Sequence, residues 1–321
     1  MKKLGVVLRV AVPLGIIAWL LSSIEPAQRD ALWSREKNWL TLAAAFGGLF
    51  LAVSLTFFRW YLLVRALELP FRMRDAFRLG FLAYLLNFIS FGSSGGDLFK
   101  AVFIAREQPG RRIEAVATIV VDRLLGIYAL LLVTAIAISL IDVSAPSPAL
   151  KAIYRLTFLT AGVATVGVAA LLLPGFATGP VARFFGGLPY LGATFERVNT
   201  SVRMYRSKLP LMFVVLGISM CVHALLPLMG YSLAISLFAS TPSVADHYLI
   251  VPISNVVGAL PITPAGLGTF EFAMEELYEM VPVEGPGDVV GVLVALTYRL
   301  LTIAVATIGV LICGWKRAAD E

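Results

Sequence analysis

Apolar runs of membrane-spanning length dominate the hydrophobicity pattern of this chain. Six of them come close to or exceed the roughly 20 residues that a helix needs to cross a bilayer. They cover residues 4–22, 40–64, 113–141, 153–173, 210–238 and 289–315. The pattern therefore predicts an all-α polytopic membrane protein with six full transmembrane helices.

Two further apolar stretches, 79–105 and 249–280, are interrupted by breaks rich in glycine, proline and polar residues. The first break lies within NFISFGSSGGDLFKA, residues 87–101, and the second within PITPAGLGTFE, residues 261–271. The limbs on either side of each break are too short to span a bilayer singly. Irregular backbone at membrane depth is tolerated only where protein buries it or where it lines a watery cavity. Each stretch is therefore predicted to be a re-entrant hairpin with its tip near mid-membrane.

The distribution of lysine and arginine predicts the orientation, because these residues mark cytoplasmic loops. They precede the first span, flank 79–105 on both sides and follow the last span, whereas 239–248 and 274–288 contain none. Both termini are predicted to be cytoplasmic, in the inner (cytoplasmic) membrane of the cell. The first hairpin then enters from the cytoplasm and the second from the outer side.

The order of spans and hairpins repeats itself along the chain. Three transmembrane helices and one re-entrant hairpin fall in residues 1–150, and the same set falls in 151–321. An odd number of spans inverts the second half, so the fold is predicted to be two inverted repeats within one membrane domain. VVDRLLGIYALLLVTA, from residue 120, echoes LTYRLLTIAVATIG, from residue 296. Inverted repeats with interrupted helices are typical of secondary transporters, with the site between the repeats.

Composition narrows the class of function. The chain is 59% hydrophobic and 14% charged, far less charged than a soluble domain. Its net charge of +6 is interpreted as a topology signal, and no nucleic-acid partner is expected. Cys221 and Cys313 lie in apolar runs, no cluster has metal-ligand spacing, and neither break has the ending of a P-loop. We therefore expect no enzyme activity, no cofactor and no metal.

Both breaks contain residues that start helices. Ser94 is followed three positions later by Asp97, which is a capping-box pattern. Thr263 and Pro264 suit a helix cap and first turn in the second break. The second limb of each hairpin is thus predicted to begin at its tip, with free N–H groups that suit an anion. Glycines beside each start allow close approach of a helix or a lipid headgroup. They are Gly95, Gly96, Gly266 and Gly268.

Two arginines are predicted to lie in the membrane interior. Arg123 and Arg299 each lie about ten residues into a span, roughly 15 Å deep. An unpaired arginine there costs at least about 2.5–3.5 kcal/mol, so carboxylates should accompany them. The plausible partners are Asp97, Asp122 and Glu271. Two guanidinium groups and two helix starts suit a phosphate or another anionic headgroup, and the carboxylates could position the arginines, bind a cationic group or carry a proton.

Structural roles compete with these functional ones. Asp97 could serve only as a helix cap, and the pairs Asp97–Arg123 and Glu271–Arg299 could serve only to hold the hairpins. A second set of polar residues has local interpretations: Lys100 snorkels toward the cytoplasm, Asn87 and Asn255 satisfy backbone groups at the tips, and His223 packs within a span. His247 is assigned to a loop with no clear signal. The candidate substrate-binding or gating residues are Asn87, Ser94, Gly95, Gly96, Asp97, Lys100, Asp122, Arg123, Asn255, Thr263, Gly266, Gly268, Glu271 and Arg299.

Four motifs together resemble a known family. SSGGDLFKA, VVDRLLGIY, PITPAGLGTFE and the late TYRLL are similar to the lysylphosphatidylglycerol synthase transmembrane family, which includes the flippase region of the multiple peptide resistance factor. The resemblance covers about residues 5–315. Other members often have Gly-Gly where this chain has Ala265-Gly266.

The resemblance implies that the protein moves a polar lipid between leaflets, as a flippase or scramblase. The lipid is anionic, aminoacylated or glycosylated, and its headgroup passes through a central polar cavity. The chain stops at Glu321, soon after the last span, so we expect any lipid synthase to be a separate protein partner. A homo-oligomer is left open. The alternatives are a secondary transporter of a small anion, an intramembrane enzyme of lipid-linked sugar or phospholipid metabolism, and a scaffold for such an enzyme.

Overall fold

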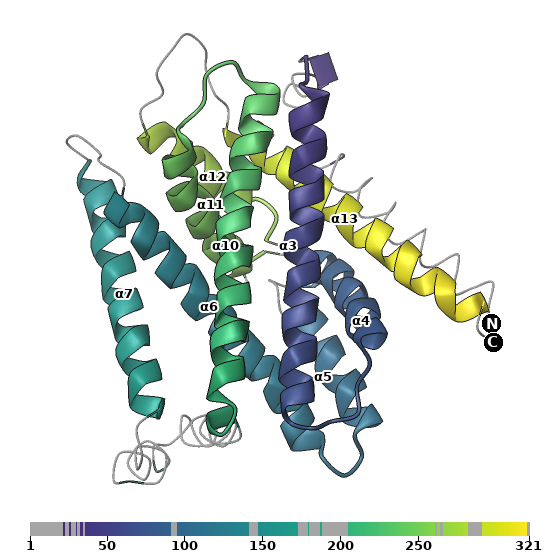
Figure 1. Ribbon diagram of the computed structural model, residues 1–321. Coiled ribbons are helices and arrows are strands. Elements are labelled where there is room, and N and C mark those ends of the chain that lie inside the picture. The colour runs from purple at the N-terminus through teal and green to yellow at the C-terminus, as the bar shows by residue number, and fades with distance from the viewer. Residues whose placement is uncertain are drawn as a thin grey trace. The chain divides into compact units, whose positions relative to one another are not determined.

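The structure is a computed structural model (Figure 1). It describes residues 36–90, 95–140, 147–172, 205–260, 262–263, 266–281 and 291–319, with isolated positions 22, 26, 30, 33, 34, 179 and 187. The predicted first span, 4–22, lies outside the described residues except for Ser22.

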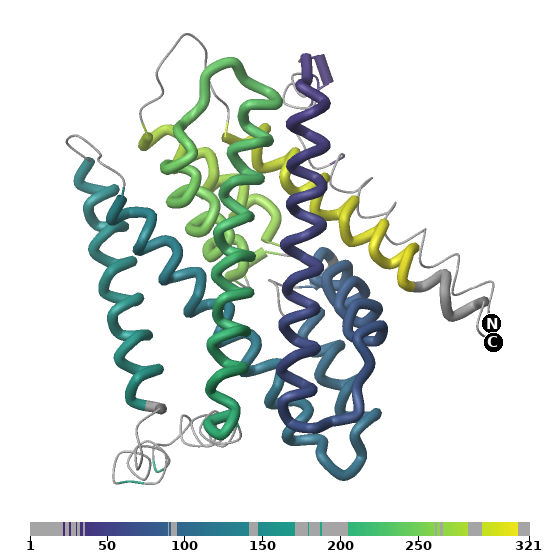
Figure 2. The backbone as a smooth tube through the Cα atoms, viewed as in Figure 1, coloured from purple at the N-terminus to yellow at the C-terminus, as the bar shows by residue number. Residues whose placement is uncertain are grey.

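Every regular element in the described part of the chain is a helix. The α-helices are α3 (Trp39–Ala66), α4 (Met73–Leu86), α5 (Gly95–Glu107), α6 (Arg112–Leu140), α7 (Pro148–Leu172), α10 (Leu209–Leu237), α11 (Val244–Ala259), α12 (Thr269–Met280) and α13 (Gly291–Ala319). A short 3-10 helix, η1 (Asn87–Ile89), follows α4. Figure 2 follows the backbone through these elements. The prediction of an all-α fold is confirmed.

Five of the described helices are long and apolar enough to cross a membrane. They are α3, α6, α7, α10 and α13. Each coincides within a few residues with one of the predicted spans, because the length of an apolar run sets the length of the helix that can lie in lipid. The chain is therefore a multi-pass membrane protein.

Each predicted hairpin consists of two shorter helices with a break between them. In the first, α4 and α5 are 14 and 13 residues long. In the second, α11 and α12 are 16 and 12 residues long. The prediction that α12 starts at Thr263 and Pro264 is wrong, because residues 266–268 form a turn and the helix begins at Thr269. Ser94, the predicted start of α5, lies outside the described residues, and that helix is described from Gly95.

The chain divides into two compact units. Unit 1 contains residues 1–54, 77–99 and 224–321, and unit 2 contains 55–76 and 100–223. Both units draw on both halves of the sequence. The predicted repeats, 1–150 and 151–321, are a different division of the chain and stay a prediction.

Small residues let the helices of unit 1 approach closely. Helix α12 packs between α11 and α13. On α13, a Cβ at Gly309 would lie 2.0 Å from the Phe81 ring of α4, and on α10 one at Gly230 would lie 2.6 Å from Val251 of α11. Close approach through glycine is a common way for membrane helices to gain packing contacts.

Unit 2 is organised around α6. The part of α3 from residue 55 onward belongs to this unit. It places Trp60 in the core, where the Trp60 ring lies 5.1 Å from the Phe71 ring. The Tyr205 hydroxyl, just before α10, donates to the Leu63 carbonyl at 2.9 Å. Helix α7 packs on α6 and exposes apolar side chains, for example Leu159 and Val166. Apolar exposure on one helix is expected where that helix contacts lipid.

Candidate functional site

A buried ion pair fixes the second break to α13. The Arg299 guanidinium donates from Nε to Glu271 Oε1 at 2.6 Å and from Nη2 to Glu271 Oε2 at 3.1 Å. Both side chains are at most 10% exposed. Glu271 Oε2 also accepts from the Gly268 N–H at 2.9 Å, which caps α12. The pair that the sequence allowed between these two residues is therefore present, and its carboxylate is satisfied by three donors.

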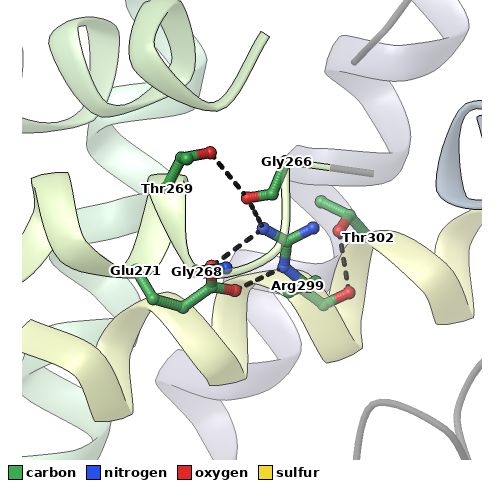
Figure 3. A network of polar contacts seen from close by, with 6 residues as sticks. All are labelled: Gly266, Gly268, Thr269, Glu271, Arg299 and Thr302. Carbon is green, nitrogen blue, oxygen red and sulfur yellow. Dashed lines mark hydrogen bonds and ion pairs between the residues drawn. The ribbon is translucent and has the colours of Figure 1, made fainter. Parts of the chain in front are cut away.

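The turn before α12 supplies a further acceptor for Arg299. As Figure 3 shows, the Gly266 carbonyl accepts from Arg299 Nη2 at 3.0 Å and from the Thr269 hydroxyl at 3.0 Å. Gly266 has φ +66 and Gly268 has φ +83, a region that glycine occupies readily. A Cβ on Gly266 would also lie 2.1 Å from the Gly258 carbonyl oxygen. The turn therefore requires glycine at 266, and it places the Gly266 carbonyl against the Arg299 guanidinium.

Aromatic and amide groups surround the pair within unit 1. The Arg299 guanidinium lies 5.5 Å from the Phe270 ring, and that ring lies 5.6 Å from Tyr298. Asn255 of α11 interacts with the Tyr298 side chain. Tyr84 of α4 interacts electrostatically with both Tyr298 and Arg299. The first hairpin therefore also contributes to the surroundings of Arg299. We call Glu271, Arg299, Tyr298, Asn255 and Tyr84 the latch cluster.

The first break is capped by its own polar side chains. Asn87 Oδ1 accepts from the Gly96 N–H at 2.8 Å, and Ser90 Oγ accepts from the Gly95 N–H at 3.2 Å. A Cβ on Gly96 would lie 2.1 Å from the Ala83 carbonyl oxygen, so glycine is needed where α5 meets α4. The prediction that Asn87 satisfies backbone at the tip is confirmed. These bonds also occupy N–H groups that the sequence analysis left free for an anion.

A second buried ion pair lies in unit 2. Arg59 Nε donates to Asp122 Oδ1 at 2.7 Å, with side chains 6% and 7% exposed. Arg59 Nη1 donates to Ser219 Oγ at 2.6 Å, and Nη2 donates to the Asp122 backbone carbonyl at 3.2 Å. The pair therefore joins α3, α6 and α10 within this unit.

Further polar side chains from α3, α5, α6 and α10 surround this second ion pair. The Trp60 indole N–H donates to the Thr118 hydroxyl at 3.2 Å, and Lys100 Nζ lies 5.1 Å from the centre of the Trp60 ring. His223 interacts with the Gly126 backbone and, electrostatically, with Arg59. Thr118, Asp122 and Gly126 are four residues apart on α6, so they share one helix face. We call Arg59, Asp122, Ser219 and His223 the midhelix cluster.

The structure corrects several predicted roles. The partner of Asp122 is Arg59. Arg123, the next residue, is exposed, and its pairing with Asp97 stays a prediction. Lys100 is 9% exposed and lies over Trp60, so it does not snorkel to the surface. His247 belongs to α11 and is fully buried, with Nε2 2.7 Å from the Tyr278 hydroxyl.

The remaining predicted residues fall into unit 1 with less definite roles. Asp97 lies in the first turn of α5, where a carboxylate complements the helix dipole. Thr263 Oγ1 is buried without a hydrogen-bond partner in the described structure. The described residues contain no group of three His, Cys, Asp or Glu side chains that could hold a metal ion.

Arg59 is the functional candidate that the sequence analysis missed. Arg59 lies within the apolar run 40–64, close to the basic residues that precede the first hairpin. It is about two turns before the end of α3, or roughly 10 Å into the helix. The cost of an unpaired arginine at that depth was the available signal. Its partner could not be identified from spacing, since 63 residues separate the two.

One comparison with known proteins identifies a family. The family model described as "Lysylphosphatidylglycerol synthase TM region" matches residues 6–309. The match includes both breaks, the latch cluster and the midhelix cluster. No curated protein matches the chain.

Proposed function

This chain belongs to the lysylphosphatidylglycerol synthase transmembrane family, and on that premise we propose that it moves a polar lipid between the leaflets of the membrane as a flippase or scramblase. Membership of this family relates the chain to lipid modification or lipid flipping. The observation that carries the proposal is the latch cluster, a buried charged group beside interrupted helices. Charged side chains within membrane proteins are costly and commonly mark transport paths.

In this proposal, α4–α5 and α11–α12 are re-entrant hairpins entering from opposite sides. Their helices have 12 to 16 residues and reach about 18–24 Å at 1.5 Å per residue. That is shorter than the roughly 30 Å hydrocarbon core. Both breaks belong to unit 1, which supports a single polar region that both hairpins line.

The contacts of Arg299 suggest how a headgroup would open the latch. The Arg299 guanidinium donates hydrogen bonds to Glu271 and to the Gly266 carbonyl. A lipid phosphate can accept two parallel hydrogen bonds from a guanidinium, as a carboxylate does. A phosphate bound to Arg299 in place of Glu271 would break the hydrogen bonds between the Glu271 carboxylate and α13. The Gly266 carbonyl would lose its hydrogen bond from Arg299 Nη2. The hairpin would then separate from α13 while the acyl chains stay in the bilayer. The charge of the headgroup would compensate Arg299, and the displaced Glu271 carboxylate would keep its hydrogen bond from the Gly268 N–H.

The test is lipid movement in proteoliposomes that contain the purified chain. Fluorescent lipids with phosphate, aminoacylated and glycosylated headgroups are scored by access to a membrane-impermeant quencher. Wild type should speed movement of at least one lipid over empty liposomes. Arg299→Lys should be slower, because lysine keeps the charge and loses the fork, and Arg299→Gln slower still. Arg111→Gln is the matched control, since Arg111 is half exposed and pairs with Glu114 at 3.5 Å in the same turn.

A panel of lipids that all move at the rate of empty liposomes would overturn the proposal. A soluble anion released from the same vesicles, with no lipid movement, would favour a small-anion transporter instead. Chemical conversion of an added lipid, detected by mass spectrometry, would favour an intramembrane enzyme.

A further inference from the structure

A second carboxylate of α12 contacts α13, one helical turn beyond Glu271. Glu275 Oε2 accepts a hydrogen bond from the Val292 backbone N–H at 2.5 Å. Val292 is the second residue of α13, and the first N–H groups of a helix have no acceptor within that helix. A carboxylate at this point also complements the positive end of the helix dipole. Glu275 therefore caps a helix to which it does not belong.

The backbones of the two helices lie close together beside this bond. Gly291, the first residue of α13, is buried, and a Cβ there would lie 2.9 Å from both the Glu275 Cα and the Met274 carbonyl oxygen. A side chain at 291 would thus push the start of α13 away from α12. Close packing and the Glu275 carboxylate together fix the first turn of α13.

The same face of α12 also holds Arg299, further along α13. Glu275 follows Glu271 by four residues, so the two carboxylates are neighbours on one face of α12. On α13, Arg299 follows Val292 by seven residues, which is about two turns and roughly 10 Å. Because each residue turns a helix by about 100°, rotating the start of α13 by one residue position would carry the Arg299 side chain away from Glu271.

From these contacts we infer that Glu275 is a positioning residue for Arg299, and that the first turn of α13 is the pivot on which the latch cluster opens. The inference rests on the proposed function, because it concerns the arginine that the proposal assigns to the lipid headgroup. The Glu275 bond uses no atom of Arg299, so a headgroup that displaces Glu271 leaves that bond in place. Helices α12 and α13 then separate at the Arg299 end and stay joined at Glu275.

Lipid movement in proteoliposomes tests the positioning role. Glu275→Ala removes the acceptor and should slow the transported lipid about 2- to 30-fold, the range that corresponds to the loss of a helix cap. Glu275→Gln keeps an oxygen acceptor and should stay within about twofold of wild type. Glu279→Ala, which removes an exposed carboxylate from the last turn of α12, is the matched control. If Glu275→Ala fails to fold, Glu275→Asp replaces it, because a side chain one methylene shorter should give a smaller slowing.

A second background separates positioning from general stability. Lysine has no planar fork to orient, so Glu275→Ala should slow Arg299→Lys by a smaller factor than it slows wild type. A purely structural role for Glu275 would slow both backgrounds by the same factor.

Spin-label distances test the pivot without any need for transport. Nitroxides on Phe272→Cys and Ile308→Cys, at side chains 63% and 38% exposed, report on the Arg299 end of the two helices. Nitroxides on Glu279→Cys and Val292→Cys report on the start of α13, and cysteine at 292 keeps the backbone N–H that Glu275 accepts. The native Cys221 and Cys313 are replaced by alanine.

The latch variant Glu271→Gln should lengthen the first of these distances and leave the second unchanged. Adding Glu275→Ala should lengthen both, because the pivot is then lost as well. A Glu271→Gln variant in which both distances lengthen equally would show that Glu275 does not anchor α13.

The outcomes separate this inference from the proposed function. The inference is overturned, and the flippase proposal stands, if Glu275→Ala moves lipid at the wild-type rate, slows both backgrounds equally, or leaves the second distance unchanged. A wild-type protein that moves no lipid overturns the flippase proposal, and the two distances then decide whether Glu275 anchors α13.

Discussion

The guanidinium of Arg299 and the carboxylate of Glu271 are 28 residues apart in the sequence and share two hydrogen bonds, of 2.6 and 3.1 Å. The pair connects α12 to α13 at the point where α12 starts. Both side chains are at least 90% buried, so solvent does little to screen the charges. Removing either partner leaves the other as an uncompensated buried charge.

We expect Glu271→Gln to lower the free energy of unfolding by about 3–5 kcal/mol, because Arg299 stays buried without its counter-ion. The double variant Glu271→Gln/Arg299→Gln should recover part of this loss. Unfolding of the purified protein in detergent measures both. The comparison pair is Lys208 and Glu68, 3.3 Å apart and exposed, where Lys208→Gln should cost at most about 1 kcal/mol. Equal losses at the two pairs would contradict this prediction.

Two glycines of the same turn should respond differently to alanine. Gly266→Ala places a Cβ 2.1 Å from the Gly258 backbone and should prevent the turn from forming, with loss of lipid movement. Gly268→Ala meets nothing within 4 Å, so it should cost only the left-handed strain, about 1–2 kcal/mol. Thermal unfolding and the transport assay distinguish the two, and equal effects would show that backbone conformation rather than space decides the turn.

The shorter of the two side-chain hydrogen bonds at the start of α5 comes from the Gly96 N–H to Asn87 Oδ1, at 2.8 Å. Asn87→Ala removes the acceptor for the Gly96 N–H and should destabilise the protein by about 0.5–2 kcal/mol. Asn87→Asp keeps an acceptor at the same position and should lose less. The measurement is again the unfolding midpoint, and a larger loss in the aspartate variant would argue that charge at this depth outweighs the hydrogen bond.

Cysteine labelling tests the re-entrant topology. In a background with Cys221 and Cys313 replaced by alanine, a cysteine at Glu68 should react with an impermeant reagent from the cytoplasmic side. One at Ala239, beyond the end of α10, should react from the outer side. A cysteine at Ile262, at the second break, should resist a bulky reagent from both sides. Labelling of 262 in bulk water from the same side as 68 would exclude the proposed hairpins.

Sequence alone determined the features that depend on local hydrophobicity and local backbone chemistry. The apolar runs predicted the ranges of α3, α6, α7, α10 and α13, because the transfer free energy of a run is a property of that run. Clusters of glycine, together with proline in the second break, located both breaks, since several such residues in succession disfavour a continuous helix, whereas the single Pro227 and Pro252 lie inside helices. The pair Glu271–Arg299 was within reach of the same reasoning, because two buried opposite charges in an apolar environment have few alternatives to pairing.

Tertiary structure decided which charges meet. Asp122 has arginine as its next residue, yet it pairs with Arg59, because the rotation of α6 turns Asp122 inward and Arg123 outward. The start of α12 at Thr269 follows from the Gly266 turn, which Glu271 holds from the first turn of α12 and Arg299 holds from the distant α13. The rotation and packing of a helix depend on all of the helices that contact it, so they cannot be predicted from the spacing of residues along that helix alone.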